Sequence, residues 1–198
     1  MPGKFIVFEG LDGSGLSTQA LMLRDWLITK GNNVVVTKEQ TDGAVGGLIK
    51  SCLKHEWKTS PLALQLLFVA DRAHHLATEI EPALAEGKNV ICDRYVFSTL
   101  AFGALGVDIE FLKTINSKFR IPDITFIIDC LPDVCLQRIG KSRFSHTELF
   151  EEKGKFEKVR ATYHSLVKFW PNVYVIDGNR PKDVIFAEIR KIAEKHGL

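Results

Sequence analysis

The feature that most constrains the fold of this chain is a glycine-rich stretch near its start, Gly10-Leu11-Asp12-Gly13-Ser14-Gly15-Leu16-Ser17-Thr18. The apolar run 5–8 precedes it, and a helical pattern follows it through Ile28. This order of strand, loop and helix nearly matches the phosphate-binding pattern G-x-x-x-x-G-K-[ST], with Gly10, Gly15 and Ser17 in register. Glycines let consecutive backbone N–H groups point into one concavity, and the positive end of the following helix adds attraction for phosphate. The stretch therefore predicts a phosphate-binding loop.

Leu16 stands where the pattern requires lysine. We expect its side chain to fold towards the helix and the core, because it carries no charge that phosphate could attract. In enzymes that act on phosphate or acyl groups, removing one preorganised charge from the active site lowers the rate by a factor on the order of 10²–10³. The backbone amides of Gly13 to Thr18 would still bind a phosphate group. A cation from the segment 140–147 or Lys38 could occupy the vacated region.

Composition bounds the class of protein. With 198 residues, 45% hydrophobic and 25% charged, the chain is expected to form a single domain over 1–198. A net charge of +2 with interspersed signs argues against polymeric nucleic acid or an anionic membrane as a partner. The sequence shows no signal peptide or membrane span, so a cytoplasmic location is expected. The four cysteines have no C-x-x-C spacing and are read as reduced thiols.

Apolar runs that alternate with helical patterns predict an α/β fold, in which a five-stranded parallel sheet is covered by helices on both faces. The predicted strands are 4–8, 33–37, 89–92, 124–129 and 173–176. The predicted helices are 16–30, 44–55, 61–86, 95–104, 108–118, 132–140, 151–169 and 181–196. A short cationic segment, 140–147, suits a mobile lid, which we place at about 140–149.

Polar residues follow the predicted strands, at the edge of the sheet where ligands of such folds bind. Asp93 and Arg94 come directly after the third strand, and 37–43 follows the second. A carboxylate suits a magnesium ion, and the arginine fork suits a phosphate. Together with the glycine-rich loop and the lid cations, they favour phosphoryl transfer, which needs held phosphates, a divalent cation and positive charge.

Several segments together resemble the thymidylate kinase family, and the similarity runs nearly end to end. The loop carries the family's acidic third position as Asp12, with flanking residues 8–9 and 17–19 that also fit. The other matching segments are Leu67-Phe68-Val69-Ala70-Asp71-Arg72 with His74 or His75, Asp93-Arg94-Tyr95 with Ser98, Ala101 and Phe102, Pro122-Asp123 to Asp129 with Pro132 and Leu136-Gln137-Arg138-Ile139, and Glu157-Lys158-Val159-Arg160 with Tyr163.

The resemblance implies a P-loop nucleoside-monophosphate kinase fold that moves the γ-phosphate of ATP to dTMP with Mg²⁺. In that case Phe68 stacks on the thymine ring, Arg72 donates to a base carbonyl, and Phe102 walls the base from the other side. Asp12 accepts from the sugar 3′-hydroxyl. The remaining acceptor-binding residues implied by the family are Lys38, Arg94 and Ser98.

The resemblance also implies the groups that assist transfer. Ser17, Glu39 and Asp93 hold the magnesium ion or its waters. Lys141 and Arg143 close over the donor and join Asp12 and Arg94 as catalytic residues. Arg138 packs along the adenine side, next to the loop residues that hold the donor. A homodimer is expected from the family alone.

The chain departs from the family pattern at three places. Leu16 replaces the loop lysine, Lys38 and Gln40 stand where Arg and Pro are usual, and Gly103 stands where many members carry Gln. Lys38 and Gln40 would remove a bidentate donor for the acceptor phosphate and a rigid bend of the loop, and Gly103 would loosen its helix and the pocket rim. Two hypotheses therefore stand. Either the chain is a working kinase whose altered pocket could admit monophosphates beyond dTMP, or it is a weak or inactive relative that binds nucleotides as a sensor or partner subunit.

For single residues, purely structural roles remain as alternatives. Phe68 and Phe102 fit core positions, and Arg72 fits a solvated helix charge. Asp93 and Arg94 fit a turn ion pair, and the lid cations fit a solvated turn.

Overall fold

The computed structural model describes residues 2–142 and 149–198, without the side chains of 141 and 142. Its centre is a five-stranded parallel sheet in the order β2-β3-β1-β4-β5. The strands are β1 (Phe5–Gly10), β2 (Val34–Lys38), β3 (Asn89–Asp93), β4 (Ile124–Asp129) and β5 (Val173–Asp177). Near-continuous apolar runs form β1, β3 and β4 because both of their faces are covered. The predicted fold class is confirmed.

Helices form where the sequence predicts them. They are α1 (Leu16–Thr29), α2 (Ala44–Leu53), α3 (Pro61–His75), η1 (Leu76–Ile80), α4 (Glu81–Ala85), α5 (Val96–Gly103), α6 (Ile109–Asn116), α7 (Pro132–Ser142), α8 (Lys153–Leu166) and α9 (Lys182–Lys195). Local capping explains two of the starts. Ser60 Oγ accepts from the Ala63 N–H ahead of α3, and Asp108 accepts from the Phe111 N–H ahead of α6.

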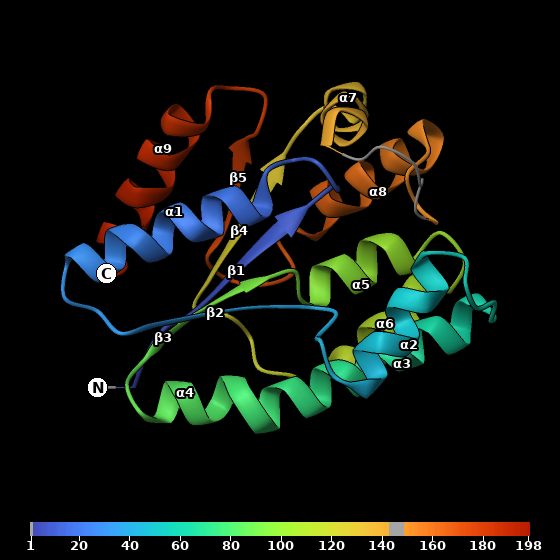
Figure 1. The fold of residues 1–198 in the computed structure, drawn as a ribbon, viewed down its shortest axis with the longest axis horizontal. Coiled ribbons are helices and arrows are strands. Elements are labelled where there is room, and N and C mark those ends of the chain that lie inside the picture. Colours follow the sequence, from blue (N-terminus) through green and yellow to red (C-terminus); the bar gives the residue numbers. More distant parts are fainter. Residues whose placement is uncertain (1, 143–148) are drawn as a thin grey trace.

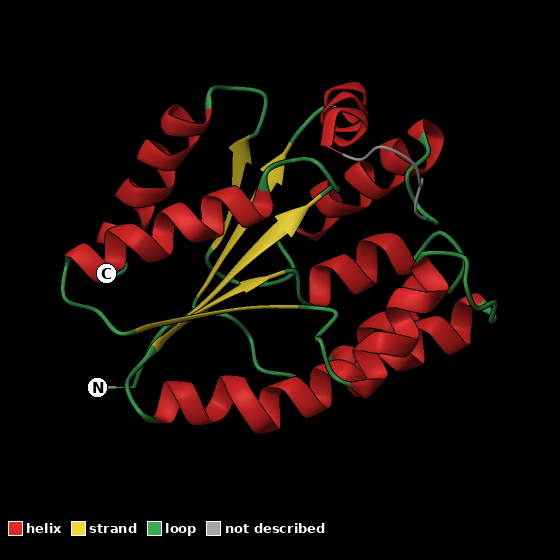
Figure 2. Cartoon of the chain, viewed as in Figure 1, coloured by secondary structure: helices red, strands yellow, loops and turns green. Residues whose placement is uncertain are grey.

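The two faces of the sheet are covered by different helices, as Figures 1 and 2 show. Alternate residues of β1 point to opposite sides. Ile6 and Phe8 belong to a buried cluster with residues of α1 and α9. Phe5 and Val7 belong to a second cluster with residues of η1, α4, α5 and α8. The core is therefore split into two layers by the sheet.

The predicted helix 61–86 is helical throughout, but it is not one regular α-helix. A π-helical turn, η1, separates α3 from α4. Pro82 lies in the first turn of α4. Proline lacks an N–H and its ring crowds the carbonyl four residues earlier, so the regular hydrogen-bond pattern is interrupted just before it.

The register of the strands brings three carboxyl ends together. Phe8 of β1 pairs with Asp93 of β3, and Lys38 of β2 pairs with the same aspartate. The glycine-rich loop leaves β1 two residues beyond Phe8. The predicted convergence of the loop, Asp93 and the segment after β2 at one edge is confirmed.

Within the two described ranges, no helix combines the length and apolar character needed to cross a bilayer. The lid predicted at about 140–149 falls mostly on residues outside those ranges, and it stays a prediction.

Leu16, the first residue of α1, belongs to the core. Its side chain is only 5% exposed and lies in the cluster that contains Phe8, Ala20 and Ile128. The prediction that this side chain folds towards the helix and the core is confirmed. The reason is the buried position at the start of α1, where a leucine adds apolar area to the contact between helix and sheet.

We expect Leu16→Ala to lower the free energy of unfolding by about 2–4 kcal/mol, because it removes buried methyl groups and leaves a cavity. The matched control is Leu21→Ala on the same helix, where the side chain is 41% exposed and the change should stay within about 0.5 kcal/mol. Urea denaturation of both variants measures the difference. Equal losses in the two variants would contradict the core assignment.

Candidate active site

The glycine-rich loop between β1 and α1 depends on glycine at several positions. Gly10, Gly13 and Gly15 have φ angles of 152°, 79° and 104°, where residues with side chains are rarely found. A Cβ at Gly10 would lie 2.7 Å from the Ile128 carbonyl oxygen, and one at Gly13 would lie 2.6 Å from that of Cys135. The loop therefore packs closely against β4 and α7. Its N–H groups at the start of α1 have no side-chain cap and are free to bind an anion.

Ser17 and Asp93 meet beside this loop. Ser17 Oγ donates a hydrogen bond to Asp93 Oδ2 at 2.5 Å. A hydroxyl and a carboxylate are ligands that Mg²⁺ accepts, and this ion usually keeps several waters and binds substrate phosphates. Among the described residues, no group of three or more His, Cys, Asp or Glu side chains could hold a metal. The pair therefore fits a magnesium ion held with phosphate and water, not a cage made by protein alone.

Glu39, predicted as a third magnesium ligand, lies next to Asp93, and its N–H donates to the Asp93 carbonyl at 3.0 Å. Its carboxylate is buried and forms an ion pair with Arg72, at 2.6 Å from Nη2 and 2.9 Å from Nε. Its other oxygen lies 3.4 Å from His75 Nδ1. Glu39 therefore serves as the counter-ion of a buried arginine, and its role towards magnesium stays a prediction. A buried charge of either sign is stable only with such a partner.

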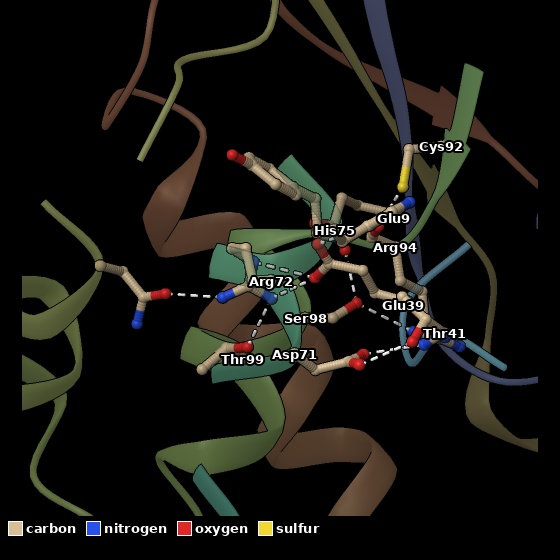
Figure 3. A network of polar contacts seen from close by, with 12 residues as sticks. Glu9, Glu39, Thr41, Asp71, Arg72, His75, Cys92, Arg94, Ser98 and Thr99 are labelled. Carbon is tan, nitrogen blue, oxygen red and sulfur yellow. Dashed lines mark hydrogen bonds and ion pairs between the residues drawn. The ribbon is translucent and has the colours of Figure 1, made fainter. Parts of the chain in front are cut away.

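Arg72 is the centre of the polar network in Figure 3, and its side chain is 1% exposed. Besides Glu39, it donates to Asn116 Oδ1 at 2.6 Å and to Thr99 Oγ1 at 2.9 Å. Its guanidinium carbon lies 5.0 Å from the centre of the Tyr95 ring. Four of the five N–H groups of an arginine are thus engaged, and one on Nη1 is left for a ligand. The alternative of a solvated helix charge is excluded.

The neighbouring Asp71 also holds the segment after β2. Its carboxylate accepts from the Thr41 N–H at 2.8 Å and from Thr41 Oγ1 at 2.6 Å. Asp71 and Arg72 on α3 therefore anchor residues 39–41 from one side, as Figure 3 shows. The Glu39–Gln40 peptide bond in this segment is cis.

Arg94 connects the loop to α5. Its Nη2 donates to Asp12 Oδ1 at 2.7 Å, and its Nη1 donates to the Gly10 carbonyl at 2.7 Å and to Ser98 Oγ at 3.1 Å. The guanidinium lies over the Phe102 ring, 5.3 Å from its centre. Nε and one N–H of Nη2 have no partner among the described residues. These two groups form the side of the guanidinium that binds a phosphate in bidentate fashion.

Glu9 is a buried carboxylate beside the site, and the sequence analysis assigned it no role. It is 1% exposed and accepts hydrogen bonds from the Tyr95 N–H at 3.0 Å, Ser98 Oγ at 2.5 Å and Tyr163 Oη at 3.3 Å. Burial raises the pKa of Glu9 to about 7, although the hydrogen bond from Ser98 and the charge of Arg94 oppose the shift. The sequence feature that points to Glu9 is its position directly before Gly10, the first glycine of the loop.

A cavity of about 240 Å³ opens between α3, α5 and the segment after β2. It is lined by every residue predicted to bind the acceptor, namely Asp12, Lys38, Phe68, Arg72, Arg94, Ser98 and Phe102. Residues not predicted also line it, among them Lys50, Gln65, Thr99 and Phe150. Sequence spacing could have found Gln65, which precedes Phe68 by one helical turn. Lys38 is more than half exposed, and its Nζ lies 3.4 Å from Asp42 Oδ1.

A second cavity lies over the glycine-rich loop. Its lining includes loop residues from Leu11 to Thr18, together with Asp93, Arg94 and Arg138. Arg138 Nη1 lies 3.4 Å from the Gly13 and Ser14 carbonyl oxygens. The two cavities share Asp12, Asp93 and Arg94, so a group bound in one can meet a group bound in the other at these residues. Arg143 and the side chain of Lys141 lie outside the part of the chain that the structure describes.

Comparisons with known proteins agree with this geometry. A family model described as thymidylate kinase matches residues 8–189. A probable thymidylate kinase of Pyrococcus horikoshii is 40% identical over 204 residues, which cover 100% of this chain and 98% of the relative. A thymidylate kinase of Leifsonia xyli is 37% identical over 196 residues, covering 96% and 93% of the two chains. One of Pelotomaculum thermopropionicum is 38% identical over 204 residues, covering 98% and 94%.

The raised pKa of Glu9 predicts a pH dependence of stability. Folding favours the protonated form, so the stabilisation is complete below about pH 4.5 and is lost as the pH rises through about 7. Glu9→Gln removes this titration. The free energy of unfolding of the variant, relative to the unmodified protein, should therefore rise by about 3 kcal/mol between pH 4.5 and pH 8. Urea denaturation at several pH values measures the change.

The control is Glu194→Gln on the exposed side of α9. The free energy of unfolding of this variant, relative to the unmodified protein, should not vary with pH by more than about 0.5 kcal/mol. A difference for Glu9→Gln that is the same at pH 4.5 and pH 8 would show that Glu9 does not titrate in this range.

Proposed function

This chain belongs to the thymidylate kinase family and phosphorylates dTMP to dTDP with ATP, and we propose that it does so without a lysine in its phosphate-binding loop. The observation that carries the proposal is the pair of cavities that share Asp12, Asp93 and Arg94. One cavity holds the donor phosphates on loop amides, and the other holds the acceptor nucleotide. Phosphoryl transfer needs these two groups held in line, with positive charge around the group that moves.

Arg94 binds the acceptor phosphate in this proposal. Its Nε and the second N–H of Nη2 are free for two parallel hydrogen bonds, while Nη1 and the other N–H of Nη2 hold the Gly10 carbonyl, Ser98 and Asp12. The protein thereby fixes the arginine before the substrate arrives, which lowers the entropic cost of orientation. Asp12 Oδ2 has no partner among the described residues and accepts from the sugar hydroxyl.

Ser17 and Asp93 hold Mg²⁺ in this proposal. The bound ion would supply positive charge to offset the charge that develops during transfer. The residues of this chain position that charge. Ser17 offers its hydroxyl from the first turn of α1, and Asp93 offers its carboxylate from the end of β3.

Arg94 and Arg138 are the cationic side chains among the described residues that line the cavity over the loop. Arg138 lies against the loop backbone, on the side where the donor binds. We assign the missing lysine charge to these arginines together with Lys141 and Arg143 of the predicted lid. The expected broader choice of acceptors and the cytoplasmic location stay predictions.

A homodimer is also part of the proposal. Apolar side chains are 40–48% exposed on α3 and on the two helices that pack against it, namely Leu62 and Leu66 on α3, Leu48 on α2 and Phe111 on α6. Exposed apolar area on adjacent elements is typical of a protein interface.

We expect the unmodified chain to transfer phosphate from ATP to dTMP in a coupled ADP assay, to lose activity with EDTA, and to regain it with Mg²⁺. Arg143→Ala and Lys141→Ala should each lower kcat tenfold or more, because a contact of the transition state is lost. The control is Arg190→Ala, an exposed arginine on α9, with unchanged kcat. If neither lid variant changes kcat, the lid does not replace the lysine. If no nucleoside monophosphate is turned over, the chain only binds nucleotides.

Leu66→Arg should convert the dimer to a monomer, because a charge at the centre of an apolar interface loses its hydration. Sedimentation equilibrium measures the mass of the particle. Ile28→Arg, at an exposed position on α1, is the matched control and should leave the mass unchanged. A monomeric unmodified chain at micromolar concentration would contradict the dimer.

A further inference from the structure

Glu9, the last residue but one of β1, lies in an apolar part of the molecule. It extends the face of the strand that carries Phe5 and Val7, because alternate residues of a strand point to the same side. That face packs against residues of α5 and α8, and the carboxylate is 1% exposed. Glu9 is not among the described residues that line the two cavities, so it can affect a ligand only through its neighbours.

One oxygen of Glu9 holds the backbone around Arg94. The φ angle of Arg94 is 73°, in the left-handed region that residues with a Cβ rarely adopt. The Arg94 N–H donates to the Phe8 carbonyl at 2.8 Å, and the next N–H, that of Tyr95, donates to Glu9 Oε1 at 3.0 Å. Such conformations persist where surrounding contacts fix them, and they are found at sites that bind ligands. Glu9 Oε1 therefore stabilises the backbone conformation from which the arginine side chain starts.

The other oxygen of Glu9 acts on the side chain of Arg94 through Ser98, within the network of Figure 3. Ser98 Oγ donates to Glu9 Oε2 at 2.5 Å and accepts from Arg94 Nη1 at 3.1 Å. A hydroxyl has one hydrogen, so its donation to Glu9 directs that hydrogen away from the arginine and leaves lone pairs for Nη1. The carboxylate thereby sets the orientation in which Ser98 can accept from the guanidinium.

Nη1 of Arg94 has a second acceptor in the same network. It donates to the Gly10 carbonyl at 2.7 Å, and Tyr163 Oη lies 3.2 Å from that carbonyl oxygen and 2.9 Å from Ser98 Oγ. The guanidinium is thus fixed through Nη1, while Nε and one N–H of Nη2 stay available for a phosphate. A donor pair that is oriented before binding loses less conformational entropy when the ligand arrives.

A carboxylate suits this position better than an amide, although the carboxylate is costly there. Burial raises the pKa of Glu9 to about 7, so the ionised form is disfavoured by the fold. A glutamine would carry no charge, but it has one acceptor oxygen and an NH₂ group. It could accept from the Tyr95 N–H or from Ser98, not from both on separate oxygens. The two hydrogen bonds towards Arg94 therefore explain why a carboxylate occupies this buried site.

We propose that Glu9 is a positioning residue for Arg94, with one carboxylate oxygen holding its backbone and the other holding its side chain through Ser98. Glu9 does not touch the substrate. It fixes the guanidinium so that the two free N–H groups meet the acceptor phosphate in parallel. The inference rests on the proposed function, because it takes Arg94 as the group that binds this phosphate.

The test measures what the acceptor phosphate contributes to binding. Thymidine and dTMP differ only in the phosphate, so the ratio of their Kd values reports the contacts made to it. Calorimetry at pH 8, where most of Glu9 is ionised, gives both Kd values for the unmodified protein and for Glu9→Gln. This variant is expected to fold, because it keeps the size of the side chain and removes a buried charge.

The matched control is Asn89→Ala. Asn89 is 6% exposed at the first position of β3, and its Oδ1 accepts from the Lys4 N–H at 2.8 Å. The control therefore also removes a buried acceptor of a backbone N–H, at the opposite end of the strand from Arg94. It should leave the preference for dTMP over thymidine within about twofold of that of the unmodified protein.

Glu9→Gln should lower the preference for dTMP over thymidine about tenfold, as for the loss of one hydrogen bond to a charged group. Its Kd for thymidine should stay within about twofold, since the nucleoside makes no contact with a phosphate-binding group. An unchanged preference in Glu9→Gln would overturn the inference. An equal rise in both Kd values would show a structural role and would overturn it too.

A double variant tests whether Glu9 acts through Arg94. In an Arg94→Ala background, Glu9→Gln should change the preference by no more than about twofold, because the group that it positions is gone. A full tenfold loss in that background would overturn the inference. If the unmodified protein transfers no phosphate but Glu9→Gln loses the preference, the proposed function is overturned and the inference is supported. An unmodified protein that binds dTMP no more tightly than thymidine would overturn the role of Arg94 and the inference with it.

Discussion

The buried ion pair between Arg72 and Glu39 organises the acceptor side of this molecule. A guanidinium that is 1% exposed is stable only when its N–H groups find partners, and those partners come from separate elements. Glu39 follows β2, Thr99 lies on α5, and Asn116 ends α6. Satisfying one arginine on α3 therefore fixes three other elements around a cavity. The same network sets the limit on what Arg72 can still offer to a ligand.

The phosphate-binding loop shows that backbone and side chain contribute separately to such a site. Close approach to β4 and α7 requires the glycines at Gly10 and Gly13, and these are present. The side chain that usually adds a charge is here Leu16, which packs in the core. The loop keeps its shape because its conformation depends on backbone contacts and not on that charge. Positive charge at the mouth of the loop comes from elements distant in the sequence, with Arg94 after β3 and Arg138 on α7.

In the wall of the acceptor cavity, a residue without a side chain on α5 lies next to a long side chain on α3. Gly103 removes a side chain from α5, and Gln65 on α3 extends into the space. In a closely packed interior, a smaller residue at one position allows a larger one at its neighbour. The polar atom that results, Gln65 Oε1, has no hydrogen-bond partner among the described residues.

Most of the fold could be predicted from the sequence, because local patterns carry it. Apolar runs of strand length, helical periodicity and the glycine-rich loop placed every strand and the edge where ligands bind. The sequence also placed Asp12, Phe68, Arg94 and Phe102 in one site, since each follows a strand or lies on a helix beside it. Only the tertiary structure decided which partners these residues have. Glu39 became the counter-ion of Arg72, which lies 33 positions away in the chain, and Glu9 became a buried acceptor for Tyr95, which lies 86 positions away. Gln65 Oε1 was left without a hydrogen-bond partner among the described residues.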